Sequence, residues 1–156
     1  MPYEQLVADC IERYRRVPGG LLPLLHAVQE ILGYIPEQSV AEIANGLNLS
    51  RAEVHGVISF YEDFRTAPGG RYRVQVCRAE ACQAMGGRTL EAHAQQRLGV
   101  GWGATTDDGA ITLEAVYCLG NCACSPSVRI DDTVYARVDA ARFDELMAAL
   151  QPEGEA

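Results

Sequence analysis

Six cysteines are the residues of this chain best suited to metal or redox chemistry. They are Cys10, Cys77, Cys82, Cys118, Cys122 and Cys124. Five of them lie from residue 77 onward, in groups that begin Cys77-x4-Cys82 and Cys118-x3-Cys122, with 35 residues between the two groups. Structural disulfides are rare in reducing compartments, so thiols grouped in this way indicate a metal, a cluster or a redox centre.

Two kinds of metal centre fit four thiolates delivered by two loops. A [2Fe–2S] cluster can take two cysteines on each iron. A structural zinc site is the main alternative. Four-cysteine zinc sites usually have two-residue gaps, or gaps of two to four residues, so zinc tolerates but does not prefer the gaps of four and three found here. A thioredoxin-type dithiol needs the pattern Cys-x-x-Cys, which the sequence lacks. The spacing therefore favours the iron–sulfur cluster and leaves zinc open.

Each cysteine group follows a predicted strand. Residues 71–76 alternate polar and apolar side chains and run directly into Cys77, and residues 111–117 form a similar segment before Cys118. The two groups are therefore expected on neighbouring loops at one end of a sheet. Gly120 would let the second loop turn close to a metal–sulfur centre, with N–H groups free to donate to sulfur.

The rest of the C-terminal half is expected to complete a small α/β layer. A helix is predicted over about 86–98, a hairpin over 128–138 and a last helix over about 143–150, before an acidic tail at 151–156. The glycine-rich stretch that includes Trp102 lacks a preceding strand and a clear following helix. We therefore interpret it as a flexible loop, with Trp102 as a partner contact.

The first 66 residues are predicted to be helical throughout. Apolar residues recur there at three- and four-residue steps in about four segments, which indicates a small helical bundle. Ser50 and Glu53 have the spacing of a capping box at the start of the last of these helices. The fold class is thus α+β, with a helical bundle at 1–66 followed by a thioredoxin-like α/β domain at 67–156.

Composition excludes several functions. The chain has 156 residues and a net charge of −8, from 21 acidic and 13 basic residues, which argues against binding to a phosphate backbone. Segment 50–57 could be the second helix of a helix-turn-helix regulator, but the acidic balance disfavours it, so no nucleic-acid partner is expected. The sequence shows no membrane-length apolar run and no secretory signal, so we expect a cytoplasmic protein without direct membrane insertion.

The motifs together resemble a known family. Cys77–Cys82 (CRAEAC) with Cys118–Cys122 (CLGNC), and the segments Leu22–Pro36 and Val54–Tyr61, are similar to the thioredoxin-like [2Fe–2S] family. That family includes the small, flavin-adjacent E-type subunit of NADH–quinone oxidoreductase, and subunits of NAD-linked hydrogenases and formate dehydrogenases. The resemblance covers about residues 3–150. The stretch Tyr117–Pro126 looks most like the gamma subunit of NAD-dependent, molybdenum-containing formate dehydrogenase.

The resemblance implies a role and a set of site residues. Cys77, Cys82, Cys118 and Cys122 would hold the [2Fe–2S] cluster. Gly120, Asn121 and Cys124 would lie around it. Cys124 is an additional thiol where many members of the family lack cysteine; it would either lie beside the cluster or compete with Cys122 as a ligand, and the x3 gap favours Cys122.

The implied protein transfers electrons and is not catalytic alone. FMN and NAD would be bound by a partner oxidoreductase subunit, and in a formate dehydrogenase a large subunit would carry molybdenum. The equivalent subunit of NADH–quinone oxidoreductase or of an NAD(P)-linked hydrogenase is the alternative within the family. A structural zinc-binding interaction module is the alternative from another class.

Overall fold

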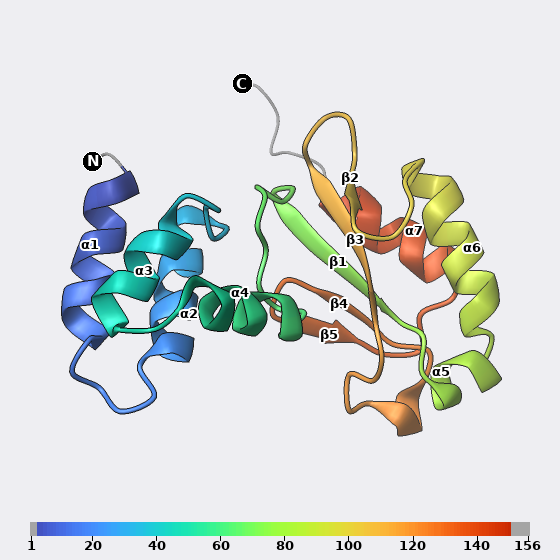
Figure 1. The fold of residues 1–156 in the computed structure, drawn as a ribbon. Helices are drawn as coiled ribbons and strands as arrows, with labels where there is room; N and C mark the ends of the chain where they lie inside the picture. The colour runs from blue at the N-terminus through green and yellow to red at the C-terminus, as the bar shows by residue number, and fades with distance from the viewer. Residues whose placement is uncertain (1–2, 151–156) are drawn as a thin grey trace. The chain divides into compact units, whose positions relative to one another are not determined.

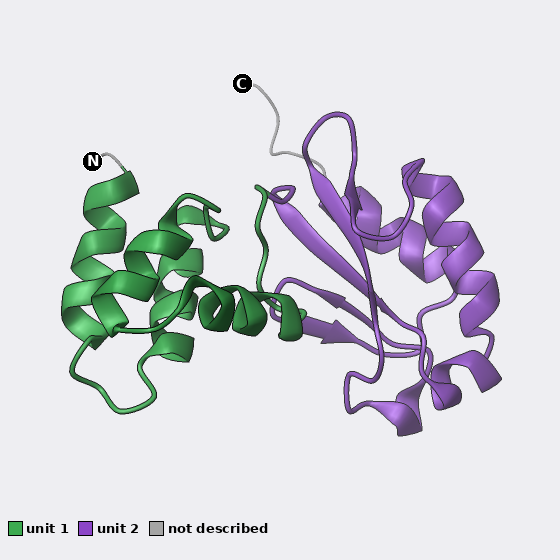
Figure 2. Ribbon diagram, in the orientation of Figure 1, with its two compact units in different colours: residues 1–68 green, residues 69–156 purple. Residues whose placement is uncertain are grey.

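The computed structural model describes residues 3–150 and divides into two compact units, residues 1–68 and 69–156 (Figure 2). The division lies between Pro68 and Gly69, two residues beyond the boundary expected from the sequence. The expected acidic tail at 151–156 lies outside the described residues. None of the helices within residues 3–150 is long and apolar enough to cross a membrane.

The first unit is a bundle of helices. Its described elements are α1 (Tyr3–Tyr14), α2 (Leu21–Leu32), α3 (Ser39–Leu47) and α4 (Arg51–Phe60) (Figure 1). Each helix turns an apolar stripe inward, and the stripes form one core centred on residues such as Val7, Leu25 and Ile43. The predicted capping box is present, because the Glu53 N–H donates to Ser50 Oγ and the Ser50 N–H donates to the Glu53 carboxylate.

A buried amide fixes the segment that follows α4. The Gln29 side chain donates from Nε2 to the carbonyl of Asp63 at 2.7 Å, and its Oε1 accepts the Arg65 N–H at 2.7 Å. The carbonyl of Arg65 accepts the N–H of Ile35. These bonds attach residues 63–65 to the bundle before the chain leaves it.

The second unit contains a mixed sheet with helices on one face. Its elements are β1 (Tyr72–Cys77), α5 (Glu80–Ala84), α6 (Gly87–Leu98), β2 (Ala104–Thr105), β3 (Ile111–Val116), a 3₁₀ turn (Cys122–Cys124), β4 (Val128–Ile130), β5 (Thr133–Tyr135) and α7 (Ala140–Ala149). The five strands of the described chain lie in the order β2-β3-β1-β4-β5. Only the β1–β3 pair is parallel among them.

The two faces of this sheet differ in polarity. Alternate residues such as Val74, Val76 and Leu113 pack with α6 and α7, which cover one face (Figure 1). The intervening positions carry a polar ladder: Gln75 donates to Glu114 at 2.9 Å and accepts from Arg129 at 2.6 Å. Because the side chains of a strand alternate, one strand supplies both the apolar core and this polar face.

Two elements of the second unit were missed by the sequence analysis. The short helix α5 holds Cys82, and β2 lies within the stretch expected to be a loop. The ring of Trp102, which was expected to contact a partner, is partly buried and packs against the core of the unit. The Gly103 N–H donates to the Leu113 carbonyl at 2.7 Å, so β3 fixes this stretch of the backbone.

Candidate iron–sulfur centre

Parallel pairing of β1 and β3 brings the two cysteine loops to one edge of the sheet. In the register of the ladder Cys77 lies opposite Val116, and the Arg78 N–H extends the pairing to the Val116 carbonyl at 2.8 Å. Cys118 follows two residues after Val116. Both loops therefore leave the sheet at the same end, as the sequence predicted.

The first pair of cysteines is buried on regular elements. Cys77 ends β1 with 2% of its surface exposed, and Cys82 lies in α5 with 3% exposed. Their side chains are close enough to share a hydrogen bond. Gly87, the first residue of α6, approaches this pair so closely that a Cβ there would lie 2.6 Å from the Cys82 carbonyl oxygen. Backbone packing therefore fixes the position of Cys82.

The second pair is exposed and lies in an irregular loop. The sulfurs of Cys118 and Cys122 are 3.6 Å apart, and the Gly120 N–H donates to Cys118 Sγ at 3.3 Å. Cys118 and Gly120 both have positive φ, at 92° and 73°. A positive φ is unfavourable for a residue with a Cβ, so strain at Cys118 marks the loop as a candidate functional site.

Three of these cysteines have shifted pKa values, and the causes of the shifts differ. Burial raises the pKa of Cys82, although hydrogen bonds from the Ser127 backbone and the Ser125 hydroxyl act in the other direction. The Gly120 N–H lowers the pKa of Cys118, because it stabilises the thiolate. The neighbouring Cys118 raises the pKa of Cys122, and the charges of Cys77 and Cys82 add to that shift. Cys122 is thus influenced by the other three thiols, from both cysteine groups.

The donor set fits an iron–sulfur cluster. Two thiolates on one tetrahedral metal at about 2.3 Å lie roughly 3.8 Å apart, close to the separation of Cys118 and Cys122. The thiols come in two pairs, the arrangement that two irons require. A bound [2Fe–2S] cluster supplies reversible transfer of one electron.

The residues predicted to lie near the cluster all belong to the second loop or its continuation. Gly120 supplies the N–H to sulfur described above. Asn121 donates from Nδ2 to the Ser127 hydroxyl at 3.2 Å, which ties the loop to the residue before β4. Cys124 ends the 3₁₀ turn and is half-buried; its N–H donates to the Asn121 carbonyl, and its own carbonyl accepts the Arg137 N–H.

Sequence analysis missed Ser125 and Ser127, which are both buried. Ser125 donates to the Cys122 carbonyl at 2.6 Å, and both serines direct a hydrogen bond toward Cys82. The signal in the sequence that could have identified them is their position directly after Cys124, in the run Ser-Pro-Ser. The donors toward the Cys82 sulfur are the hydroxyl of Ser125 and the backbone N–H of Ser127.

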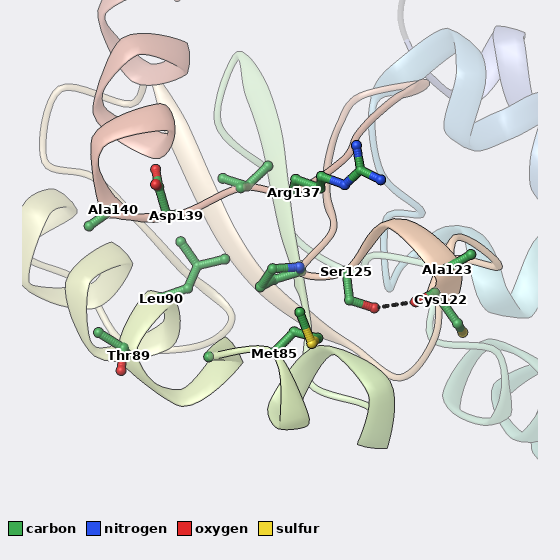
Figure 3. Close-up of a pocket in the computed structure, with 12 residues that line it drawn as sticks. Met85, Thr89, Leu90, Cys122, Ala123, Ser125, Arg137, Asp139 and Ala140 are labelled. Atoms are coloured by element: carbon green, nitrogen blue, oxygen red, sulfur yellow. Dashed lines mark hydrogen bonds between the residues drawn. The ribbon is translucent and has the colours of Figure 1, made fainter.

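A surface pocket of about 690 Å³ opens beside the second cysteine pair (Figure 3). Met85, Leu90, Cys122 and Ser125 are among the residues that line it. The hydrogen bond from Ser125 to Cys122 runs along its edge (Figure 3). Cys122, one of the four candidate ligands, therefore borders this pocket.

Comparison with known proteins identifies the class of the chain. The family model described as "Thioredoxin-like [2Fe-2S] ferredoxin" matches residues 7–151. The chain belongs to this family, and its cofactor is accordingly a [2Fe–2S] cluster, as the cysteine spacing predicted. The thioredoxin-like α+β fold expected from the sequence is confirmed as well.

Particular relatives are subunits of larger oxidoreductases. The chain is 34% identical to an E-type subunit of NADH–quinone oxidoreductase from Rhizobium meliloti (strain 1021), over 97% of this chain and 90% of that protein. It is 30% identical to "NADP-reducing hydrogenase subunit HndA" of Solidesulfovibrio fructosivorans, over 94% of this chain and 86% of that protein.

A solved structure of an NAD⁺-reducing [NiFe]-hydrogenase is also similar, in its H₂-reduced state. The TM-score is 0.73 at 26% identity. The match covers 87% of this chain and 23% of the hydrogenase chain, so the likeness concerns one part of that larger protein.

Proposed function

We propose that this chain is the electron-transfer subunit of a multi-subunit, NAD-linked oxidoreductase. Its [2Fe–2S] cluster would be held by Cys77, Cys82, Cys118 and Cys122, and it would exchange single electrons with a partner subunit that binds FMN and NAD. The observation that carries this proposal is the meeting of two cysteine pairs at one sheet edge in a member of the [2Fe–2S] family.

The names of the relatives support a role inside a complex. One relative is named as a subunit of an NADH–quinone oxidoreductase and another as a subunit of a hydrogenase. Both enzyme classes pass electrons between a nicotinamide and one-electron carriers, which requires a flavin or an equivalent centre to split the hydride. We therefore place FMN and NAD on the partner. All six thiols are free in the described structure, which suits a reducing cytoplasm.

The specific complex is a finer proposal. The stretch Tyr117–Pro126 favours the gamma subunit of an NAD-dependent formate dehydrogenase, whose large subunit would carry molybdenum. The relatives named above favour the equivalent subunit of an NADH–quinone oxidoreductase or an NAD(P)-linked hydrogenase. These possibilities share the cluster and the flavin partner and differ in the origin of the electrons.

Electron paramagnetic resonance of the anaerobically purified, dithionite-reduced protein tests the cluster. We expect a signal from one unpaired electron, with about two iron atoms and about two acid-labile sulfide ions per chain. A sample with no signal, no sulfide and stoichiometric zinc would contradict the proposal and support the zinc-binding interaction module.

Purification of the tagged chain from its native cells tests the partner. We expect a co-purifying flavoprotein, and we expect NADH to reduce the cluster in that complex. Reduction by formate, with molybdenum in the sample, would support the formate dehydrogenase assignment. Reduction by hydrogen would support a hydrogenase. A chain purified with its cluster but without flavin would contradict the proposed partner.

A further inference from the structure

Arg78 directly follows the buried ligand Cys77, and its side chain has three neighbours that the cluster site does not otherwise use. Its Nε lies 3.0 Å from Glu91 Oε2 on α6. Its guanidinium carbon lies 5.2 Å from the centre of the Trp102 ring. Its Nη1 has a long contact of 3.5 Å with the Tyr117 hydroxyl. A charge pair and an aromatic face therefore hold the guanidinium.

The backbone of Arg78 is fixed as well. Its N–H donates to the Val116 carbonyl at 2.8 Å, and its carbonyl accepts a hydrogen bond from Gln83 Nε2 at 2.8 Å. Gln83 follows the ligand Cys82, and Tyr117 precedes the ligand Cys118. Arg78 is thus next to Cys77 in the chain, and it contacts the residues next to Cys82 and Cys118.

Glu91 makes this contact electrostatically important. Only 12% of its side chain is exposed, and Oε1 is buried without a hydrogen-bond partner in the described chain. Glu91 Oε2 pairs with Arg78. Removing one member of such a shielded pair leaves the other charge uncompensated, which is strongly unfavourable.

We propose that Arg78 is a positioning residue that joins the two cysteine loops, and that the Arg78–Glu91 pair sets the reduction potential of the cluster. This inference rests on the proposed function, because the four cysteines must hold the cluster. Reduction adds one electron, and hence negative charge, at the sulfur end of β1. A nearby cation favours that added charge and a nearby anion opposes it.

Redox titration of the purified, cluster-loaded full chain, followed by electron paramagnetic resonance, tests the pair. We expect Arg78→Gln to lower the midpoint potential and Glu91→Gln to raise it. Each change should alter the ratio of reduced to oxidised cluster at a fixed potential by on the order of fivefold. The midpoint potential of the double variant is expected to lie between those of the two single variants. The midpoint potential of Arg78→Lys, which keeps the charge, should lie nearer to that of the wild type than the potential of Arg78→Gln does.

Arg97→Gln is the matched control. Arg97 is also an arginine paired with an acid, Asp144. It lies ten residues after Gly87, the first residue of α6, and therefore about 15 Å along the helix axis from the end of α6 that approaches Cys82. The Arg97→Gln variant removes the same charge from the chain as Arg78→Gln. We expect its potential to equal that of the wild type, which separates a local effect of Arg78 from an effect of net charge.

The opposite signs of the two shifts decide the outcome. Simple loosening of the fold would shift both single variants in one direction, and that result, or unchanged potentials in both, would overturn the proposal. If Arg78→Gln does not load the cluster, Glu91→Gln decides alone: a raised potential supports the proposal, and an unchanged or lowered one overturns it. A wild-type chain without a cluster would overturn the proposed function together with this inference.

Discussion

The two units bury different kinds of polar group. In the helical unit, the buried Gln29 and Ser39 bond to backbone atoms of the unit itself and complete its turns. In the sheet unit, Ser125 and Ser127 are buried next to the cysteines and direct hydrogen bonds at Cys82. The buried polar groups of the helical unit thus fix the path of the chain, whereas these two serines of the sheet unit serve the sulfur site. Matched substitutions in the two units test this difference.

The largest effect is expected from the cysteines themselves. Serine at Cys77, Cys82, Cys118 or Cys122 should abolish the cluster, because serine is a poor replacement for a thiolate ligand of iron. Iron and sulfide analysis of each variant measures this. The helical unit should keep its helicity by circular dichroism, since its core contains none of the four residues. Cys124→Ser is the control, and loss of the cluster in that variant would make Cys124 a ligand instead.

Two glycines give the next comparison. A Cβ at Gly87 would meet the backbone of Cys82, at 2.6 Å from its oxygen and 2.8 Å from its carbonyl carbon. We expect Gly87→Ala to lower the free energy of unfolding by about 2 kcal/mol and to reduce cluster content, because the backbone must shift. Denaturant unfolding and iron analysis measure the two effects.

Gly46→Ala is the counterpart in the helical unit. There the added Cβ would meet side-chain atoms of Ile11 and no backbone atom, and the cost of this contact is offset because alanine stabilises a helix interior relative to glycine by about 1 kcal/mol. We expect a net change of roughly 1 kcal/mol or less, with unchanged cluster content. Cluster loss in this variant would contradict the independence of the two units.

The sequence predicted much of the fold and the candidate ligands, for identifiable reasons. The helices of the first unit and the strands before Cys77 and Cys118 follow from local periodicity, and the cysteine groups from spacing. The contact between Arg78 and Glu91 could not be predicted, because it joins residues 13 apart through tertiary packing. Likewise, nothing in the sequence distinguishes Gly87, which touches a cysteine backbone, from the adjacent Gly86.

A pair of side-chain amides gives effects of similar size on stability. Gln29→Ala should lower the free energy of unfolding by about 2 kcal/mol, because two backbone partners lose their hydrogen bonds. Asn121→Ala removes one hydrogen bond, to Ser127, and should lower the free energy of unfolding by about 1 kcal/mol. Only Asn121→Ala should accelerate cluster loss on incubation with a chelator. Equal rates of cluster loss in both variants would remove the distinction between the units.

The smallest effect is a pH dependence of the capping box. The Ser50 N–H lowers the pKa of Glu53 below its ordinary value of 4.5. The resulting stabilisation is therefore present above that value and is lost as the pH falls through the pKa of the folded state. Glu53→Gln should be less stable than the wild type at neutral pH, and the difference should vanish in acid, below the pKa of Glu53 in the folded state. Urea unfolding at the two pH values measures this, and a difference that persists in acid would contradict the assignment.

Parallel pairing of β1 with β3 also restricts which insertions and deletions the chain can accept during evolution. The ladder places Cys77 opposite Val116, so the distance between the cysteine loops does not depend on the number of residues in the connection. Length changes in the exposed turn at 107–109 would leave the sulfur atoms in place. Deletion of one residue within β3 would shift the strand by about 3.3 Å and turn its side chains to the opposite face. The 35-residue interval can therefore lengthen or shorten in its turns, while β3 must keep its length.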